Sequence, residues 1–133
     1  MSQENVEIVR AALETWNRGD LEASLEYVSP GWEWHTAQLF PGTDAVYRGK
    51  QGFTRFWNNF REPWESISVE IERIEDLGDR VLVLFMFYGQ GKLSGVDVTT
   101  EYANVFTVHD GRVIYQVGYG DWKSALEAVG LSE

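Results

Sequence analysis

The chain has 133 residues, of which 44% are hydrophobic and 14% aromatic, and its formal net charge at neutral pH is −10. This size and composition indicate one globular domain spanning residues 1–133 and exclude a disordered chain. The negative charge argues against nucleic acid and anionic membranes as partners, because both bind basic surfaces. The absence of cysteine excludes disulfides, a thiolate nucleophile and cysteine-ligated metals.

The opening residues, MSQENVEIVR, lack the basic and apolar regions of a signal peptide. No run approaches the roughly 18 consecutive apolar residues of a membrane span. We therefore expect a soluble cytoplasmic protein.

The first third of the chain is patterned as helices. Residues 3–18 carry an apolar stripe at helical spacing, which predicts a helix that ends at Gly19. Asp20 can cap a short second helix that ends at Ser29-Pro30-Gly31. The third helix is predicted over residues 49–61, where aromatic side chains recur on one side. That aromatic side consists of Phe53, Phe56, Trp57 and Phe60.

Strands are predicted elsewhere. WEWHT, residues 32–36, alternates tryptophans with polar residues and is predicted to be a strand. Residues 37–48 are expected to form a loop, which can include a short strand at residues 45–48. From Glu65 onward the period is two, and Val81–Tyr88 is typical of a strand buried on both faces. With a terminal helix over Trp122–Val129, the fold class is α+β: a curved mixed or antiparallel sheet wrapped around three N-terminal helices as a barrel or cone, with a short C-terminal helix.

The segment from Thr99 to Asp121 is predicted to be a long hairpin, because Asp110-Gly111 is a strong turn signal between two alternating runs. If those two residues form the loop, the numbers of facing residues sum to 221. One face is then almost hollow, and we expect it to form a pocket wall. The hollow face comprises the pairs Thr107/Ile114, Val105/Gln116, Ala103/Gly118 and Glu101/Gly120. The opposite face is rich in aromatics and comprises Val108/Val113, Phe106/Tyr115, Asn104/Val117, Tyr102/Tyr119 and Thr100/Asp121.

Five segments in this order resemble the SnoaL-like branch of the nuclear-transport-factor-2-like superfamily. They are WNRGDLEASLEYVSPGWEW, YRGKQGFTRFW, GDRVLVLFMFYGQGKLSGV, VHDGRV and YGDWKSALEAVGL, the last being similar to a frequent ending of uncharacterised bacterial members. The resemblance implies a single domain in which a curved sheet encloses a deep pocket. It does not imply one chemistry, because the fold serves isomerases, cyclases, hydrolases and non-catalytic modules.

Two of these chemistries fit the sequence poorly. Ketosteroid isomerase needs two acidic hydrogen-bond donors, and the corresponding places fall at about Ala12 and Ala103, which cannot donate. Epoxide hydrolysis in this fold uses an Asp-Arg-Asp set, but Arg48 falls in a loop while Arg55 and Arg61 fall on the outward side of the third helix. A cyclase needs little more than one pocket acid.

Glu101 and His35 are the candidate catalytic residues. Glu101 is the carboxylate on the hollow face, where a water-poor pocket would raise its pKa. His35 ends the first strand, about where the isomerases place their carboxylate base. The alternatives are a solvated glutamate at the pocket mouth and a histidine hydrogen-bonded at a strand end. His109 flanks the hairpin turn and is expected to be exposed.

Trp34, Trp57, Tyr88 and Gln116 are predicted to line the pocket and bind a ligand. Asp121 is expected to cap the last helix rather than to act chemically. No metal is expected, because two separated histidines offer no ligand spacing, and no glycine loop of cofactor-binding type is present.

The leading functional hypothesis is the binding of a small apolar or cyclic molecule, with any catalysis being cofactor-free acid–base chemistry. The alternative is a non-enzymatic dimerisation or partner-binding module whose cone is filled by its own side chains. A homodimer through the exposed sheet face is compatible with both, because that face would carry an apolar row. The row consists of Tyr102, Phe106, Tyr115, Val117 and Tyr119.

Overall fold

The computed structural model of the protein describes residues 2–40 and 42–132. In chain order the elements are α1 (Ser2–Arg18), α2 (Leu21–Leu25), β1 (Val28–His35), β2 (Val46–Arg48), α3 (Gly49–Arg61), β3 (Trp64–Asp76), β4 (Arg80–Gly91), β5 (Asp97–His109), β6 (Arg112–Tyr119) and α4 (Trp122–Ala128). The predicted order of helices and strands is confirmed. One boundary differs, because Ser29-Pro30-Gly31 lies within β1 instead of ending a helix.

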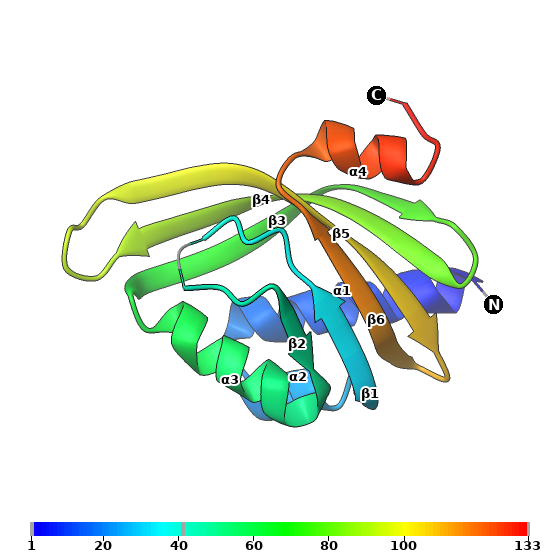
Figure 1. Cartoon of the computed structure of the whole chain (residues 1–133), viewed down its shortest axis with the longest axis horizontal. Coiled ribbons are helices and arrows are strands. Elements are labelled where there is room, and N and C mark those ends of the chain that lie inside the picture. The colour runs from blue at the N-terminus through cyan, green and yellow to red at the C-terminus, as the bar shows by residue number, and fades with distance from the viewer. Residues whose placement is uncertain (1, 41, 133) are drawn as a thin grey trace.

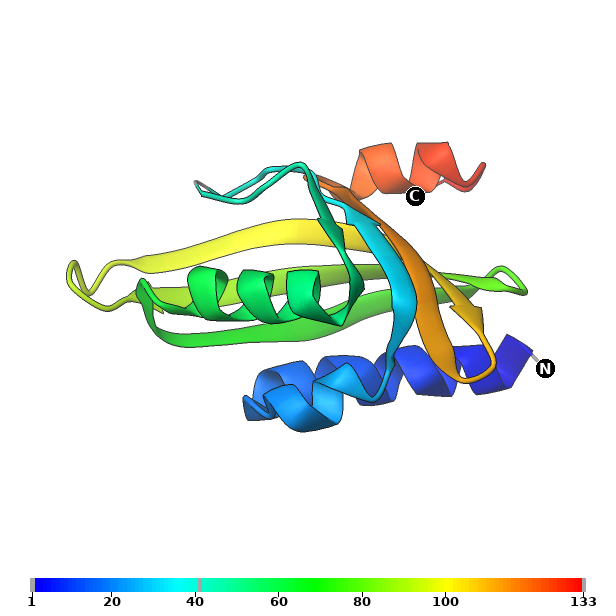
Figure 2. The same ribbon diagram turned by 60° about the horizontal axis from the view of Figure 1, so that its bottom comes forward.

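The six strands form one mixed sheet in the order β2-β1-β6-β5-β4-β3. β1 pairs with β6 in parallel, and the other neighbours are antiparallel. The predicted α+β class with a curved mixed sheet is confirmed, and the sheet stays open, with β2 at one edge and β3 at the other, so it is not closed into a barrel. Helices α1, α2 and α3 lie on one side of the curved sheet and α4 on the other (Figures 1 and 2).

Each face of the sheet has its own apolar cluster. The larger cluster packs the helical side of the sheet against α1 and α3, and it contains Val9, Trp32, Trp34 and Phe56. The smaller cluster lies under α4, where Leu126 packs among outward-facing residues of β4 and β5. β4 therefore contributes to both clusters, which explains its unbroken apolar run.

A β-bulge near the tip of the β5–β6 hairpin changes its register. His109/Arg112 and Val108/Val113 pair as predicted, with numbers that sum to 221. The next pair is Thr107/Tyr115, so Ile114 is the extra residue and the sum becomes 222 from there on. Because a shift of one residue exchanges the faces of one strand relative to the other, the predicted pairing is wrong beyond the turn.

The bulge inverts the predicted faces of β5. Tyr102, Asn104 and Phe106 point to the helical side, whereas Ala103 and Val105 pack towards α4. On β6 the expectation for Gln116 was right, and Gln116 now pairs with Phe106. The predicted apolar row is therefore divided between the two sides of the sheet.

Arg61 also departs from its predicted outward position. Its guanidinium lies between the rings of Trp16 and Trp57, 4.3 and 4.1 Å from their centroids. It donates a hydrogen bond to the backbone carbonyl of Trp16. Arg61 thus links the end of α3 to the end of α1.

Candidate functional site

A cavity of about 130 Å³ lies between the helical side of the sheet and helices α1 to α3. Its wall is mainly aromatic. The lining residues are Ala12, Leu13, Trp16, Ser24, Tyr27, Val28, Trp32, Trp34, Leu39, Phe40, Thr43, Phe53, Phe56, Phe60, Val69, Phe85, Phe87, Tyr102, Asn104, Phe106, Val113 and Gln116. The helices and the sheet enclose the cavity from opposite sides, so both layers determine its shape.

Two tryptophan–amide pairs form the polar part of the sheet wall. The alternation of β1 directs Trp32 and Trp34 inward, and both are buried. Trp34 Nε1 donates to Asn104 Oδ1 at 3.1 Å, and Trp32 Nε1 donates to Gln116 Oε1 at 3.1 Å. Each pair joins β1 to a residue of the β5–β6 hairpin, so the same bonds that hold the wall together also orient its amides.

Tyr102 lies beside this wall and is buried. Its burial raises the pKa of the phenol to about 12, and a smaller, opposing effect comes from the backbone N–H of Ala37. The ring fits because position 118 is glycine: a Cβ on Gly118 would lie 2.3 Å from the Tyr102 hydroxyl oxygen. Gly118 therefore makes room for the tyrosine, which remains protonated at neutral pH.

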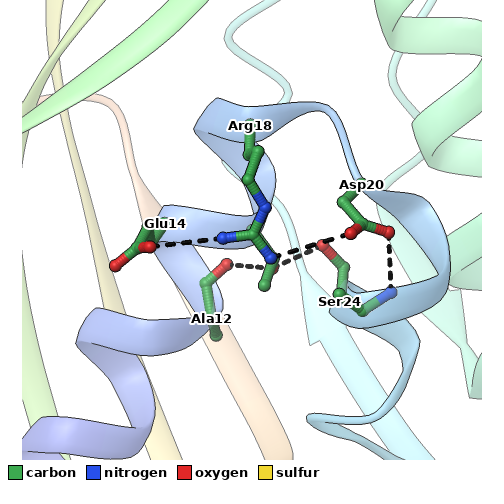
Figure 3. A network of polar contacts seen from close by, with 7 residues as sticks. Ala12, Glu14, Arg18, Asp20 and Ser24 are labelled. Carbon is green, nitrogen blue, oxygen red and sulfur yellow. Dashed lines mark hydrogen bonds and ion pairs between the residues drawn. The ribbon is translucent and has the colours of Figure 1, made fainter.

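On the helical side, a polar network fixes α2 against α1 (Figure 3). The Thr15 hydroxyl donates to the carbonyl of Ala12 and shares a 2.6 Å hydrogen bond with the buried Ser24 hydroxyl. Asp20 caps α2 by accepting from the backbone N–H of Ala23, and Arg18 reaches towards Asp20. The hydroxyl of Ser24, although it borders the cavity, is thus held by Thr15.

Two of the four residues predicted to line the pocket do so, namely Trp34 and Gln116. Trp57 is buried but packs against Trp16 and Arg61, outside the cavity. Tyr88 faces the opposite side of the sheet and is partly exposed. Both misplaced residues are aromatic, and sequence alone cannot tell an aromatic residue that lines a cavity from one that fills the core.

Glu101 lies outside the cavity, so its predicted place on the pocket wall is wrong. It pairs with Met86 on the far side of the sheet from the cavity, as the register after the bulge requires. Its Oε1 accepts the backbone N–H of Trp122 at 3.1 Å. Together with Asp121, which accepts from the N–H of Ser124, it stabilises the start of α4.

His35 also lies outside the cavity, on the outer side of β1. Its Nε2 is 2.5 Å from Glu33 Oε2, and Arg48 donates to the other oxygen of Glu33 at 2.9 Å. These hydrogen bonds, with that from His35 first, hold the pKa of Glu33 below its usual value. His35 is far from Glu101 in the sheet, so the structure does not bring the two predicted catalytic residues together.

The cavity wall is uncharged. None of the lining residues within the described chain is Asp, Glu, Lys, Arg or His. Across residues 2–40 and 42–132, no three His, Cys, Asp or Glu side chains gather as metal ligands would. Sequence reasoning missed Asn104, whose position inside the otherwise apolar run Tyr102–Phe106 was the available signal.

Residues 9–116 match the family described as the SnoaL-like domain. The chain belongs to this family. No curated protein matches the SnoaL-like domain described here. Within its described residues, no helix is long and apolar enough to cross a membrane.

Solved structures share the fold of this SnoaL-like domain at low sequence identity. An NTF2-like protein of unknown function from Burkholderia pseudomallei K96243 is 19% identical, with 96% of each chain covered and a TM-score of 0.80. TerC, co-crystallised with polyporic acid, is 21% identical, covering 89% of this chain and 92% of TerC, with a TM-score of 0.79. An LEH-like epoxide hydrolase of M. tuberculosis is 20% identical, covering 90% and 84%, with a TM-score of 0.74. These likenesses show the fold alone.

Proposed function

We propose that this SnoaL-like domain binds a small, uncharged, ring-shaped molecule in the cavity between its sheet and helices. The observation that carries the proposal is a cavity of about 130 Å³ whose wall is almost wholly aromatic and aliphatic. Burial of an apolar ring in such a wall is favourable, because the hydrophobic effect scales with the apolar area removed from water.

The volume limits the ligand to about one ring. An apolar protein cavity of about 150 Å³ takes up benzene. The cavity here is of similar size and much smaller than the several hundred Å³ of sites for drug-sized ligands. A molecule with several fused rings would require the wall to move.

The lack of charge in the described wall limits the ligand further. An ion transferred into this wall would lose its hydration without gaining a charged partner, which is strongly unfavourable. The wall also holds neither Glu101 nor His35. The proposal is therefore one of binding, without proton transfer between those two residues.

Proteins of the same fold support a small-molecule function. TerC was co-crystallised with polyporic acid, and another member of the fold is an epoxide hydrolase. Since the identities are near 20%, neither ligand nor reaction can be transferred to this domain. What supports the proposal is that this fold accommodates organic molecules in at least one co-crystal structure.

The test is to fill the cavity from α1. Ala12 lines the cavity whereas its neighbour Ala11 does not, so Ala12→Leu and Ala11→Leu form a matched pair. Cyclohexanone and methylenecyclohexane serve as single-ring probes, with affinities read from tryptophan fluorescence or calorimetry. We expect at least tenfold weaker binding in Ala12→Leu and unchanged binding in Ala11→Leu and in Glu101→Gln. The proposal fails if the wild type binds neither probe at millimolar concentration, or if Ala12→Leu binds as the wild type does.

A further inference from the structure

The two amides of the cavity wall, Asn104 and Gln116, both use their oxygen within the protein. We infer that their NH2 groups form a donor-only polar surface, which selects ring compounds that carry a carbonyl oxygen. The inference rests on the proposed binding function and specifies the class of ligand. The wall also carries the hydroxyls of Ser24, Tyr27, Thr43 and Tyr102, so variants of Asn104 and Gln116 are needed to assign the selectivity to the amides.

The orientation of each amide follows from its tryptophan partner. An indole N–H can only donate a hydrogen bond, so the atom that faces it must be the amide oxygen. Trp34 thereby fixes Asn104, and Trp32 fixes Gln116, each through a 3.1 Å bond. With the oxygen directed at an indole, the NH2 group of each amide must point elsewhere.

No acceptor within residues 2–40 and 42–132 pairs with either NH2 group. Neither nitrogen is among the fully buried unpaired atoms, so each stays accessible to a ligand. Asn104 is nevertheless 4% exposed overall, so its amide lies in the interior and borders the cavity. Buried polar groups are rarely left unpaired in folded proteins. A ligand oxygen in the cavity is the partner that would complete the hydrogen bonding of both amides.

The two donors lie close enough to serve one small ring. Asn104 pairs with Gly118, and Gln116 pairs with Phe106, so the amides are diagonal neighbours on one face of adjacent antiparallel strands. Side chains so related are about 7–8 Å apart at their bases. The Tyr102 hydroxyl takes the space that a side chain at position 118 would fill, so it also belongs to this part of the wall. One or two carbonyl oxygens on a single ring can therefore meet the two NH2 groups.

The selectivity expected is measurable. A hydrogen bond to a group that is otherwise left unpaired gives about a tenfold difference in affinity over an apolar isostere. Cyclohexanone and methylenecyclohexane differ only in C=O against C=CH2, so the ratio of their dissociation constants reports hydrogen bonding to the carbonyl oxygen. We expect the wild-type protein to bind cyclohexanone at least tenfold more tightly than methylenecyclohexane. The comparison is made after each dissociation constant is corrected for the partitioning of that probe between water and cyclohexane.

Two variants remove the donors while keeping side chains of similar shape and length. In Asn104→Leu and Gln116→Met, the preference for the ketone should fall about tenfold, while the affinity for methylenecyclohexane stays within about twofold. Gln116 is less buried than Asn104, so Gln116→Met provides the test if Asn104→Leu does not fold, as judged by near-ultraviolet circular dichroism.

Trp34 is inferred to act as a positioning residue. Trp34→Phe removes the indole N–H and frees the Asn104 oxygen, so the preference for ketone should fall and binding of cyclohexanol, which can donate, should rise. If Trp34 had only a structural role, Trp34→Phe would weaken the binding of cyclohexanone, methylenecyclohexane and cyclohexanol equally. That result would contradict the positioning role.

The outcomes separate the inference from the function on which it rests. The donor surface is overturned if the wild type binds ketone and hydrocarbon with equal corrected affinities. It is also overturned if Gln116→Met keeps the wild-type preference for the ketone. Either result leaves the proposed binding of a ring intact. Absence of binding for both probes would overturn both. A preference for the ketone that disappears with the amides would support both.

Discussion

At the scale of single residues, Tyr102 shows how one glycine determines the environment of a phenol. Gly118 leaves the space that the Tyr102 hydroxyl occupies, and the surrounding wall removes that hydroxyl from water. Desolvation disfavours the charged phenolate, which is why the pKa rises to about 12. The neutral form is thus stabilised by folding, and the protein should be sensitive to alkali at this residue.

The sign of the effect follows from the direction of the shift. Because the folded pKa is higher than the unfolded value of about 10, the stabilisation is complete below pH 10 and is lost as the pH rises towards about 12. A shift of this size corresponds to roughly 3 kcal/mol. Urea unfolding at pH 8 and at pH 12 should show the wild type losing roughly 2–3 kcal/mol more than Tyr102→Phe.

Tyr115→Phe is the control for that experiment, since Tyr115 is a partly exposed tyrosine of the same sheet. It should lose stability between the two pH values as the wild type does. Equal losses in the wild type and in Tyr102→Phe would show that the phenol is not desolvated as described.

At the scale of elements, the helical layer depends on contacts between the ends of α1 and α3. Arg61 provides them, with one aromatic ring on each side and a hydrogen bond to the backbone carbonyl of Trp16. Burial lowers the pKa of this guanidinium, but the two rings and the carbonyl offset part of the loss of hydration. Since Trp16 also lines the cavity, the same contacts hold one side of the site.

Arg61→Met keeps the length of the side chain and removes its charge and donors. We expect the free energy of unfolding to fall by about 2 kcal/mol, from the lost cation–π contacts and the unpaired carbonyl. In the control Arg55→Met, the loss should stay within about 1 kcal/mol, because Arg55 pairs with Asp44 at the exposed surface and lies over a single ring, that of Tyr47, at 5.2 Å. Similar losses in the two variants, measured by chemical denaturation, would show that Arg61 contributes no more than a surface arginine.

At the scale of the whole molecule, the two sides of the sheet differ in how fully they are covered. Helices α1 to α3 lie over the cavity side, whereas the short α4 covers only part of the outer side (Figure 2). Tyr88 and Tyr115 face outward beyond it, each 38% exposed. The homodimer through this face, expected from the sequence, stays our prediction.

Tyr115→Glu tests it by placing a charge within the proposed interface. Sedimentation of the wild type should give a dimer, and Tyr115→Glu should shift the equilibrium towards monomer, because burial of an unpaired carboxylate opposes association. Leu93→Glu, at the fully exposed turn between β4 and β5, should leave the dimer intact. A wild-type protein that sediments as a monomer would exclude the predicted homodimer.

Local pattern was sufficient for most of the fold. The third helix was expected over residues 49–61 and forms there, because an aromatic stripe at helical spacing and a following Glu62-Pro63 are signals within one segment. Gln116 was placed in the cavity by its position in an alternating strand, and Trp34 by the same rule. Such assignments depend on neighbours a few residues away.

The composition of the cavity wall depended on the tertiary structure. The alternation of β5 was evident, but which of its faces points inward depends on its register with β6, and the extra residue Ile114 changes that register without leaving a sequence signal. The bulge moves Glu101 out of the cavity and brings Asn104 in. Local patterns specify the order of the helices and strands and the aromatic side of α3. Only the packing of the strands decided which polar groups reach it, because register is a property of two strands together and alternation is a property of one.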